Sequence, residues 1–214
     1  MDPHSESNSR LKVFLENPSK ALWTLAIPIM FGMGIQTLYN LVDMIFIGKL
    51  GGQAITGIAF NMPLFFLVLG LTMGLGTGVT ASIARFIGQE NKKQADNSAE
   101  HAVFMAAIIS VFLSLIGLMF GKTILTFFGA KGEILNLGWE YLRVMCIGMP
   151  FMIFSGFFRS ILAGEGDMKF PMMIAGLGTV LNIILDPIFI FELESYGGFG
   201  FGLGIAGAAM ATVI

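Results

Sequence analysis

Charged residues are scarce in this sequence, and their scarcity separates it from soluble proteins. Asp, Glu, Lys and Arg make up 12% of the 214 residues, whereas a typical soluble domain has about 25%. Hydrophobic residues account for 55%, and the mean hydropathy is +0.81. The net charge of −2 excludes the basic surface that nucleic-acid binding requires, so we expect no nucleic-acid partner. This composition predicts a membrane protein.

Cysteine, histidine and processing signals are also scarce. The single cysteine, Cys146, lies inside an apolar run and has no second cysteine in the chain with which to form a disulfide. His4 and His101 lie far apart in polar segments, which argues against a histidine-based metal site, and no cofactor is expected. The N-terminus lacks the short apolar core of a signal peptide, so residues 1–17 are expected to form a cytoplasmic tail.

Long apolar runs predict the fold. A helix needs about 20 predominantly apolar residues to cross a bilayer, and five runs meet this length while a sixth is cut short. We therefore predict an all-α membrane protein, a six-span helical bundle in which residues 18–214 form one transmembrane lobe and the last span is truncated. The expected spans are residues 20–47, 54–82, 100–121, 138–162, 170–191 and 203–214.

The basic residues of the loops predict the orientation. Eight Lys and Arg residues lie in the N-terminal tail and in the loops after the second and fourth spans, against three in the alternate loops. Cytoplasmic loops carry the excess of Lys and Arg, so the N-terminus is expected in the cytoplasm. The expected location is the inner or plasma membrane of the cell, which the chain crosses several times.

Two spans carry matching polar stripes. "LYNLVDMIFIG" and "LNIILDPIFIF" each place an amide and a carboxylate inside an apolar run. Residues three and four apart share one face of a helix. Both spans run outward, and each aspartate precedes its outer end by about five residues, so the acids are expected at similar depth. The stripes consist of Gln36, Tyr39, Asn40 and Asp43 in the first span, and of Thr179, Asn182 and Asp186 in the fifth.

Acids inside transmembrane segments are rare and usually face a cavity, an ion path or a proton relay. Two neighbouring carboxylates bind and release protons as a coupled pair, which suits H⁺. Oxygen ligands from Asp, Asn and Thr equally suit Na⁺. The alternative is that both acids lie near the lipid headgroups and are only hydrated there. Pro28 and Pro187 each remove a backbone hydrogen bond and are expected to bend the two spans.

An ordered set of segments from Lys20 to Ile214 resembles the multidrug and toxic compound extrusion (MATE) transporters. The segments are "LAIPIM", "LVDMIFIGKLG", "MGLGTGVTASIARFIGQENKKQA", "GMPFMIFSGFFRSILAGEGDMKFPM", "LNIILDPIFIF" and "GIAGAAMATVI". The resemblance implies twelve spans in two lobes, of which this chain is the N-terminal one. It also implies alternating access and the export of cationic or amphipathic compounds in exchange for H⁺ or Na⁺.

The resemblance assigns roles to single residues and to partners. The positions that match the family's coupling-ion site are Tyr39, Asp43, Asn182, Asp186 and Thr212, and Na⁺ would be held by Asp43, Asp186, Asn182 and Thr212. The expected partners are small cationic or amphipathic substrates, the lipid bilayer and a C-terminal lobe that this sequence does not contain. H⁺ is favoured over Na⁺, because a complete Na⁺ shell requires Thr212.

Two other functions agree less well with the sequence. A flippase for lipid-linked sugars or polysaccharides would need a basic groove for a phosphate headgroup, which the spans do not provide. An intramembrane aspartyl protease is the enzyme alternative, since two membrane aspartates are its hallmark. Its Gly-x-Gly-Asp pattern is missing, because the acids stand in "NLVD" and "IILD". We therefore expect a transporter and not an enzyme.

Overall fold

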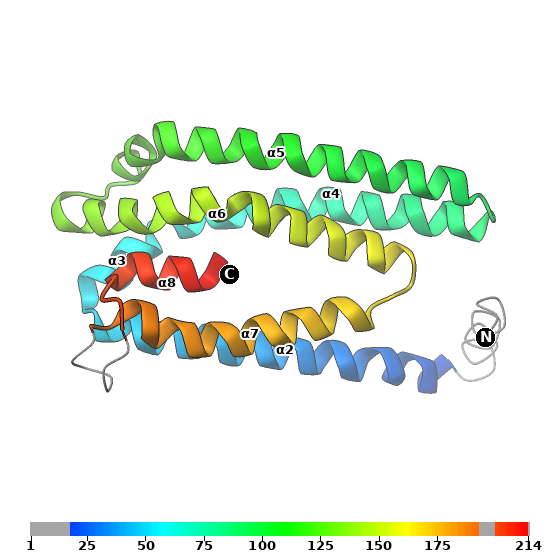
Figure 1. The fold of residues 1–214 in the computed structure, drawn as a ribbon, viewed down its shortest axis with the longest axis horizontal. Helices are drawn as coiled ribbons and strands as arrows, with labels where there is room; N and C mark the ends of the chain where they lie inside the picture. The colour runs from blue at the N-terminus through cyan, green and yellow to red at the C-terminus, as the bar shows by residue number, and fades with distance from the viewer. Residues whose placement is uncertain (1–17, 193–199, 214) are drawn as a thin grey trace.

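The computed structural model describes residues 18–192 and 200–213, in which every regular element is a helix (Figure 1). The predicted all-α architecture is confirmed. The tail expected over residues 1–17 lies outside the described residues. In chain order the helices are α2 (Pro18–Lys49), α3 (Gly52–Ala59), α4 (Met62–Gly88), α5 (Lys92–Phe127), α6 (Gly132–Gly164), α7 (Lys169–Ile190) and α8 (Gly204–Val213).

The described helices have the length and the surface of membrane spans. Helices α4, α5, α6 and α7 are long and apolar enough to cross a bilayer, and α8 is a shorter apolar helix. Large apolar side chains point away from the bundle: Phe127 is 86% exposed, and Met119 and Phe151 are each 72% exposed. Such surfaces are stable where lipid covers them. The chain is therefore a multi-pass membrane protein.

The segment expected as one span over residues 54–82 forms two helices. The break between α3 and α4 lies at Asn61, and Pro63 occupies the first turn of α4, where its missing N–H is not needed. The Asn61 side chain closes the break, because its Nδ2 donates to the carbonyls of Gly57 at 2.9 Å and of Gly138 in α6 at 3.0 Å. Residues 54–82 are uniformly apolar, so their hydropathy does not show that a helix ends at Asn61 and is hydrogen-bonded there to α6.

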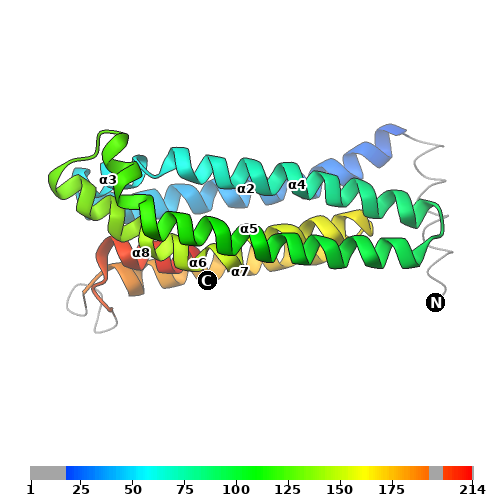
Figure 2. The same cartoon turned by 90° about the horizontal axis from the view of Figure 1, so that it is seen from above.

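The long helices form two layers. Helices α4, α5 and α6 make one layer, and α2 and α7 make the other (Figures 1 and 2). The short helix α8 lies between them and packs against both α6 and α7. We call the end of the bundle that holds α3 the α3 end; the loop between α5 and α6, the end of α7 and the start of α8 lie there too. The first layer is joined by the buried side chains of Val79, Ile83, Ala102, Ala106, Ile153, Phe157 and Ile161.

Short capped turns connect the helices at the opposite end. The Asn91 side chain accepts a hydrogen bond from the Gln94 amide at 3.2 Å and begins α5. Asp167 Oδ1 accepts from the amides of Lys169 at 2.9 Å and Phe170 at 3.2 Å, and these bonds begin α7. Each cap satisfies amides that a helix leaves open in its first turn. Turns this short make consecutive helices antiparallel neighbours.

Candidate ion-binding site

Helices α2 and α7 place Asp43 and Asp186 at similar depth. The two helices pack together, and near their ends the rings of Phe46 and Phe191 meet edge to face with centroids 6.0 Å apart. Lys49 Nζ lies over both rings, at 5.7 and 5.5 Å from their centroids. At about 1.5 Å per residue, Asp43 lies about 4.5 Å and Asp186 about 7.5 Å below this pair along their helices.

The acids and one amide of the predicted site are brought together in the bundle. Asp186 is 0% exposed and Asn182 is 5% exposed, while Asp43 is half-buried. Asp43 and Asp186 stand on two helices that pack against each other. Three predicted site residues from two distant segments of the chain therefore share one buried region.

These three side chains hold an unusual set of unpaired polar atoms. Among the described residues, Asp43 Oδ1, both oxygens of Asp186 and both amide atoms of Asn182 are buried without a hydrogen-bond partner. Buried polar groups in proteins nearly always have partners, and each one left without a partner costs about 1–3 kcal/mol. Four of these five atoms are oxygens. The arrangement can therefore accept a proton or coordinate a small cation with oxygen ligands.

Helix α8 brings Thr212 to a similar depth. It runs antiparallel to α7, and Gly207 lies against the carbonyl of Phe189, where a side chain would collide. From that contact, Thr212 lies about 7.5 Å and Asp186 about 4.5 Å further into the bundle. The Thr212 hydroxyl donates to the carbonyl of Ala208 at 2.9 Å, so its oxygen can serve another group only as an acceptor. Its role as an ion ligand stays a prediction.

The remaining predicted residues of the first stripe are described only in part. The side chains of Gln36, Tyr39, Asn40 and Pro28 lie outside the described part of the structure. The backbone of α2 is helical through all four positions. Gln36, Tyr39, Asn40 and Asp43 therefore share one face of α2, as the sequence predicts.

Thr179 of the second stripe and Pro187 next to it affect α7 in different ways. Thr179 donates to the carbonyl of Ala175 in its own helix at 2.9 Å. Pro187 lies inside α7 and has no N–H, so it cannot donate to the carbonyl of Ile183. In the part of the chain that the structure describes, no side chain takes the place of that donor. Helix α7 thus has a weakened turn directly beside Asp186.

An apolar cluster separates the acids from the α3 end. It draws on α2, α3, α7 and α8, and the rings of Phe46 and Phe191 pack against it. Ile47 and Ile190 belong to it, each four residues beyond one of the acids toward the α3 end. Apolar packing of this kind excludes water. The buried residues of the cluster are Ile47, Ala54, Ile58, Ile190, Ile205 and Ala208.

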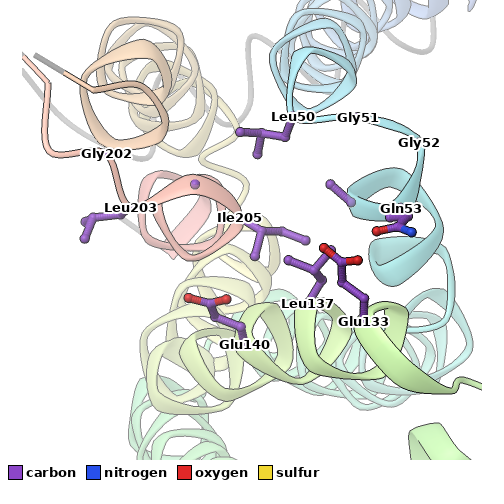
Figure 3. A pocket seen from close by; sticks show the side chains of 12 residues that line it. Leu50, Gly51, Gly52, Gln53, Glu133, Leu137, Glu140, Gly202, Leu203 and Ile205 are labelled. Atoms are coloured by element: carbon purple, nitrogen blue, oxygen red, sulfur yellow. The ribbon is translucent and has the colours of Figure 1, made fainter. Parts of the chain in front are cut away.

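On the side of this cluster away from the acids, a cavity of about 470 Å³ opens at the α3 end (Figure 3). Glu133 and Glu140 of α6 and Gln53 of α3 face it. With its amide nitrogen turned toward Glu133, Gln53 donates to Oε2 at 2.6 Å. Sequence reasoning missed this cavity, because its residues lie on three elements with no common motif. Within the described residues, no group of three or more His, Cys, Asp or Glu side chains could hold a metal ion.

Known proteins resemble most of the chain. The MatE family model matches residues 28–188. The probable multidrug resistance protein NorM of Thermotoga maritima is 33% identical over 91% of this chain and 41% of that protein. The multidrug export protein MepA of Staphylococcus aureus is 30% identical over 97% and 45%. The FAD transporter of Shewanella oneidensis is 29% identical over 91% and 42%. The chain thus spans less than half the length of these relatives.

Solved structures agree with these relatives. A multidrug resistance MATE family transporter of the MOP superfamily, in its outward-facing conformation, has a TM-score of 0.82 and 40% identity over 92% of this chain and 42% of that one. A MATE structure in the bent conformation has a TM-score of 0.81 and 38% identity over 95% and 44%. With the family model matching three quarters of its residues, the chain belongs to the MatE family of multidrug and toxic compound extrusion transporters.

Proposed function

We propose that this chain is the six-span N-terminal lobe of a transporter that exports small cationic or amphipathic compounds in exchange for H⁺ or Na⁺. Asp43, Asp186 and Asn182 hold the coupling ion, and the hydroxyl oxygen of Thr212 completes the site. One observation carries the proposal: the two acids and Asn182 leave five buried polar atoms without partners. The six spans are α2, the pair α3 and α4, α5, α6, α7, and α8 as the beginning of the sixth.

The ion acts on the contact between α2 and α7. When no ion is bound, two carboxylates at close range repel each other, and both lose hydration. A shared proton or a cation removes the repulsion and links Asp43 to Asp186. The proline-weakened turn at Ile183 and Pro187 lets α7 bend as this link forms or breaks. The bend is the step by which ion binding changes the shape of the lobe.

Charge at the two ends supports a cytoplasmic N-terminus. Arg85, Lys92, Lys93 and Lys169 lie near the turns at the end opposite α3. The α3 end carries Glu133 and Glu140 at the cavity. The excess of Lys and Arg marks the cytoplasmic side. The cavity therefore faces the outside of an inner or plasma membrane.

Replacing the acids tests the proposal. In the full-length protein, Asp43→Asn and Asp186→Asn should each reduce ion-driven export by at least about tenfold, because the ion loses a charged ligand. Asp96→Asn is the matched control, since Asp96 is exposed in the first turns of α5. Export of a cationic dye and of FAD is followed in separate proteoliposome assays, because relatives are named for drugs and for FAD.

The same vesicles distinguish the two ions. An inward proton gradient without sodium should drive wild-type export if H⁺ is coupled, and a sodium gradient at constant pH should do so if Na⁺ is coupled. Full activity of both acid variants under both gradients would refute the site. In that case Asp43 and Asp186 are structural, and the transporter couples elsewhere.

A further inference from the structure

Pro150 leaves an open carbonyl in the middle of α6, and α5 supplies its donor. Pro150 has no N–H, so the carbonyl of Cys146, four residues earlier, has no donor in its own helix. Such a group is costly in a membrane unless a neighbour satisfies it. Ser114 of α5 does so, because its Oγ donates to the Cys146 carbonyl at 2.6 Å. The helices touch here, since a side chain at Gly117 would collide with Cys146 Sγ.

The capped turn of α6 also supports α8. Gly148 lies between Cys146 and Pro150, and Val213 of α8 occupies the space that a Gly148 side chain would need. A Cβ at Gly148 would lie 2.8 Å from the Val213 Cβ. Figure 1 shows α6 changing direction about halfway along its length, with the end of α8 beside it. Val213 directly follows Thr212, so the bend of α6 determines where Thr212 lies.

We propose that Ser114 is a positioning residue for the ion site. Its hydrogen bond to the Cys146 carbonyl holds the bend of α6, and the bend seats α8 so that Thr212 stays at the depth of Asp186. The effect of Thr212 on transport rests on the proposed function. The claim that Ser114 determines where α8 lies is independent of it. Ser114 lies on a helix that carries no residue of the candidate site, so its effect passes through α6.

A double-variant cycle isolates this hydrogen bond. Ser114→Ala removes the donor, and Pro150→Ala restores a backbone N–H that can bond to the same carbonyl. Ser110→Ala is the matched control: Ser110 is 1% exposed on the same helix, but its hydroxyl donates to Ala107 within α5. The Ala107 carbonyl keeps its helical donor without Ser110, so this change opens no carbonyl.

Hydrogen exchange of the full-length protein measures the placement of α8. Ser114→Ala should speed the exchange of the amides at 208–213 about tenfold, as expected when a buried acceptor loses its donor. Ser110→Ala should leave the rate near the wild-type value. The double variant Ser114→Ala/Pro150→Ala should exchange more slowly than Ser114→Ala alone. Equal rates in Ser114→Ala and Ser110→Ala, or no rescue by Pro150→Ala, would overturn the inference.

Transport kinetics separate positioning from general support of the fold. Ser114→Ala should raise the concentration of coupling ion at half-maximal transport about fivefold, with the maximal rate per folded protein unchanged. A smaller yield of folded protein with an unchanged half-maximal concentration would show a structural role only and refute the positioning role. If Asp186→Asn keeps full ion-driven export, the proposed function fails, and the exchange cycle on α8 still decides whether Ser114 positions that helix.

Discussion

Asn61 offers a sharp test of how the helix break is held, through the change Asn61→Ala. Asn61 is 4% exposed, and its own amide donates to the carbonyl of Ile58 at 2.8 Å instead of to Gly57. The Gly57 carbonyl therefore depends on the Asn61 side chain, which also donates to Gly138. The change to alanine removes both hydrogen bonds together.

The expected loss follows from the number of bonds and from their surroundings. Polar contacts between membrane helices contribute about 0.6 kcal/mol on average and at most about 1.7 kcal/mol each. Two bonds therefore predict a loss of about 1–3 kcal/mol in the free energy of unfolding. Water cannot easily replace them, because the backbones touch: a Cβ at Gly138 would lie 2.9 Å from the Gly57 oxygen. The loss should thus lie toward the upper end of the range.

Unfolding of the purified full-length protein in mixed micelles, titrated with sodium dodecyl sulfate, measures the loss. Thr56→Ala is the control, because Thr56 is only partly buried and its hydroxyl donates to Gly52 within α3. Asn61→Ala should unfold at a clearly lower detergent fraction than Thr56→Ala. If the two variants unfold together, the interhelical bond to Gly138 contributes nothing measurable, and the break between α3 and α4 is held by packing alone.

Two further predictions concern topology and bending. Cysteines introduced as Lys93→Cys and Lys169→Cys should react only with reagents in the cytoplasm, and a cysteine introduced as Glu133→Cys only with reagents outside the cell. The buried Cys146 should stay unreactive. The opposite labelling pattern would reverse the orientation. Pro187→Ala restores the donor to the Ile183 carbonyl, so α7 should show a smaller ion-dependent change in hydrogen exchange. Export should slow about tenfold relative to the wild type, and an unchanged response of α7 would place the bend elsewhere.

Hydropathy and helical periodicity predict much of this structure. Apolar runs locate the long helices, because burial in lipid requires apolar side chains along a whole span. Counting residues from the helix ends places Asp43 and Asp186 at similar depth, because both segments are regular helices. Spacing alone also puts Asn182 one turn from Asp186, and both are buried. Their assignment as ion ligands remains a prediction.

Contacts between distant segments are not visible in a single sequence. The break at Asn61 depends on a carbonyl of α6 that lies 77 residues away. The cavity lined by Gln53, Glu133 and Glu140 likewise joins α3, α6 and α8, whose residues follow no shared pattern. In the sequence, Ser114 looks like any small residue at a helix contact. Its role becomes visible only when the structure shows it next to the Cys146 carbonyl that Pro150 leaves without a donor. Tertiary packing decides each of these features, and local propensity does not.

Pro150 in α6 and Pro187 in α7 differ in how the carbonyl that each leaves open is satisfied. Three side chains from other helices or turns donate to carbonyls of α6, namely Asn61, Ser114 and Thr80, the last at 2.8 Å to Ser160. One of these bonds satisfies the carbonyl that Pro150 leaves open. Within the described residues, no side chain from another helix donates to α7.

Among the described residues, no interhelical side-chain bond to α7 would break if its open turn at Ile183 changed shape, so we expect α7 to bend at lower cost than α6. That turn lies beside Asp186, the most deeply buried acid among the described residues. Under the proposed function, charge cancellation at Asp186 would act on this turn. In the proposed cycle the bonded layer of α4, α5 and α6 stays fixed while α7 bends, and α8, which packs against both α6 and α7, lies between them.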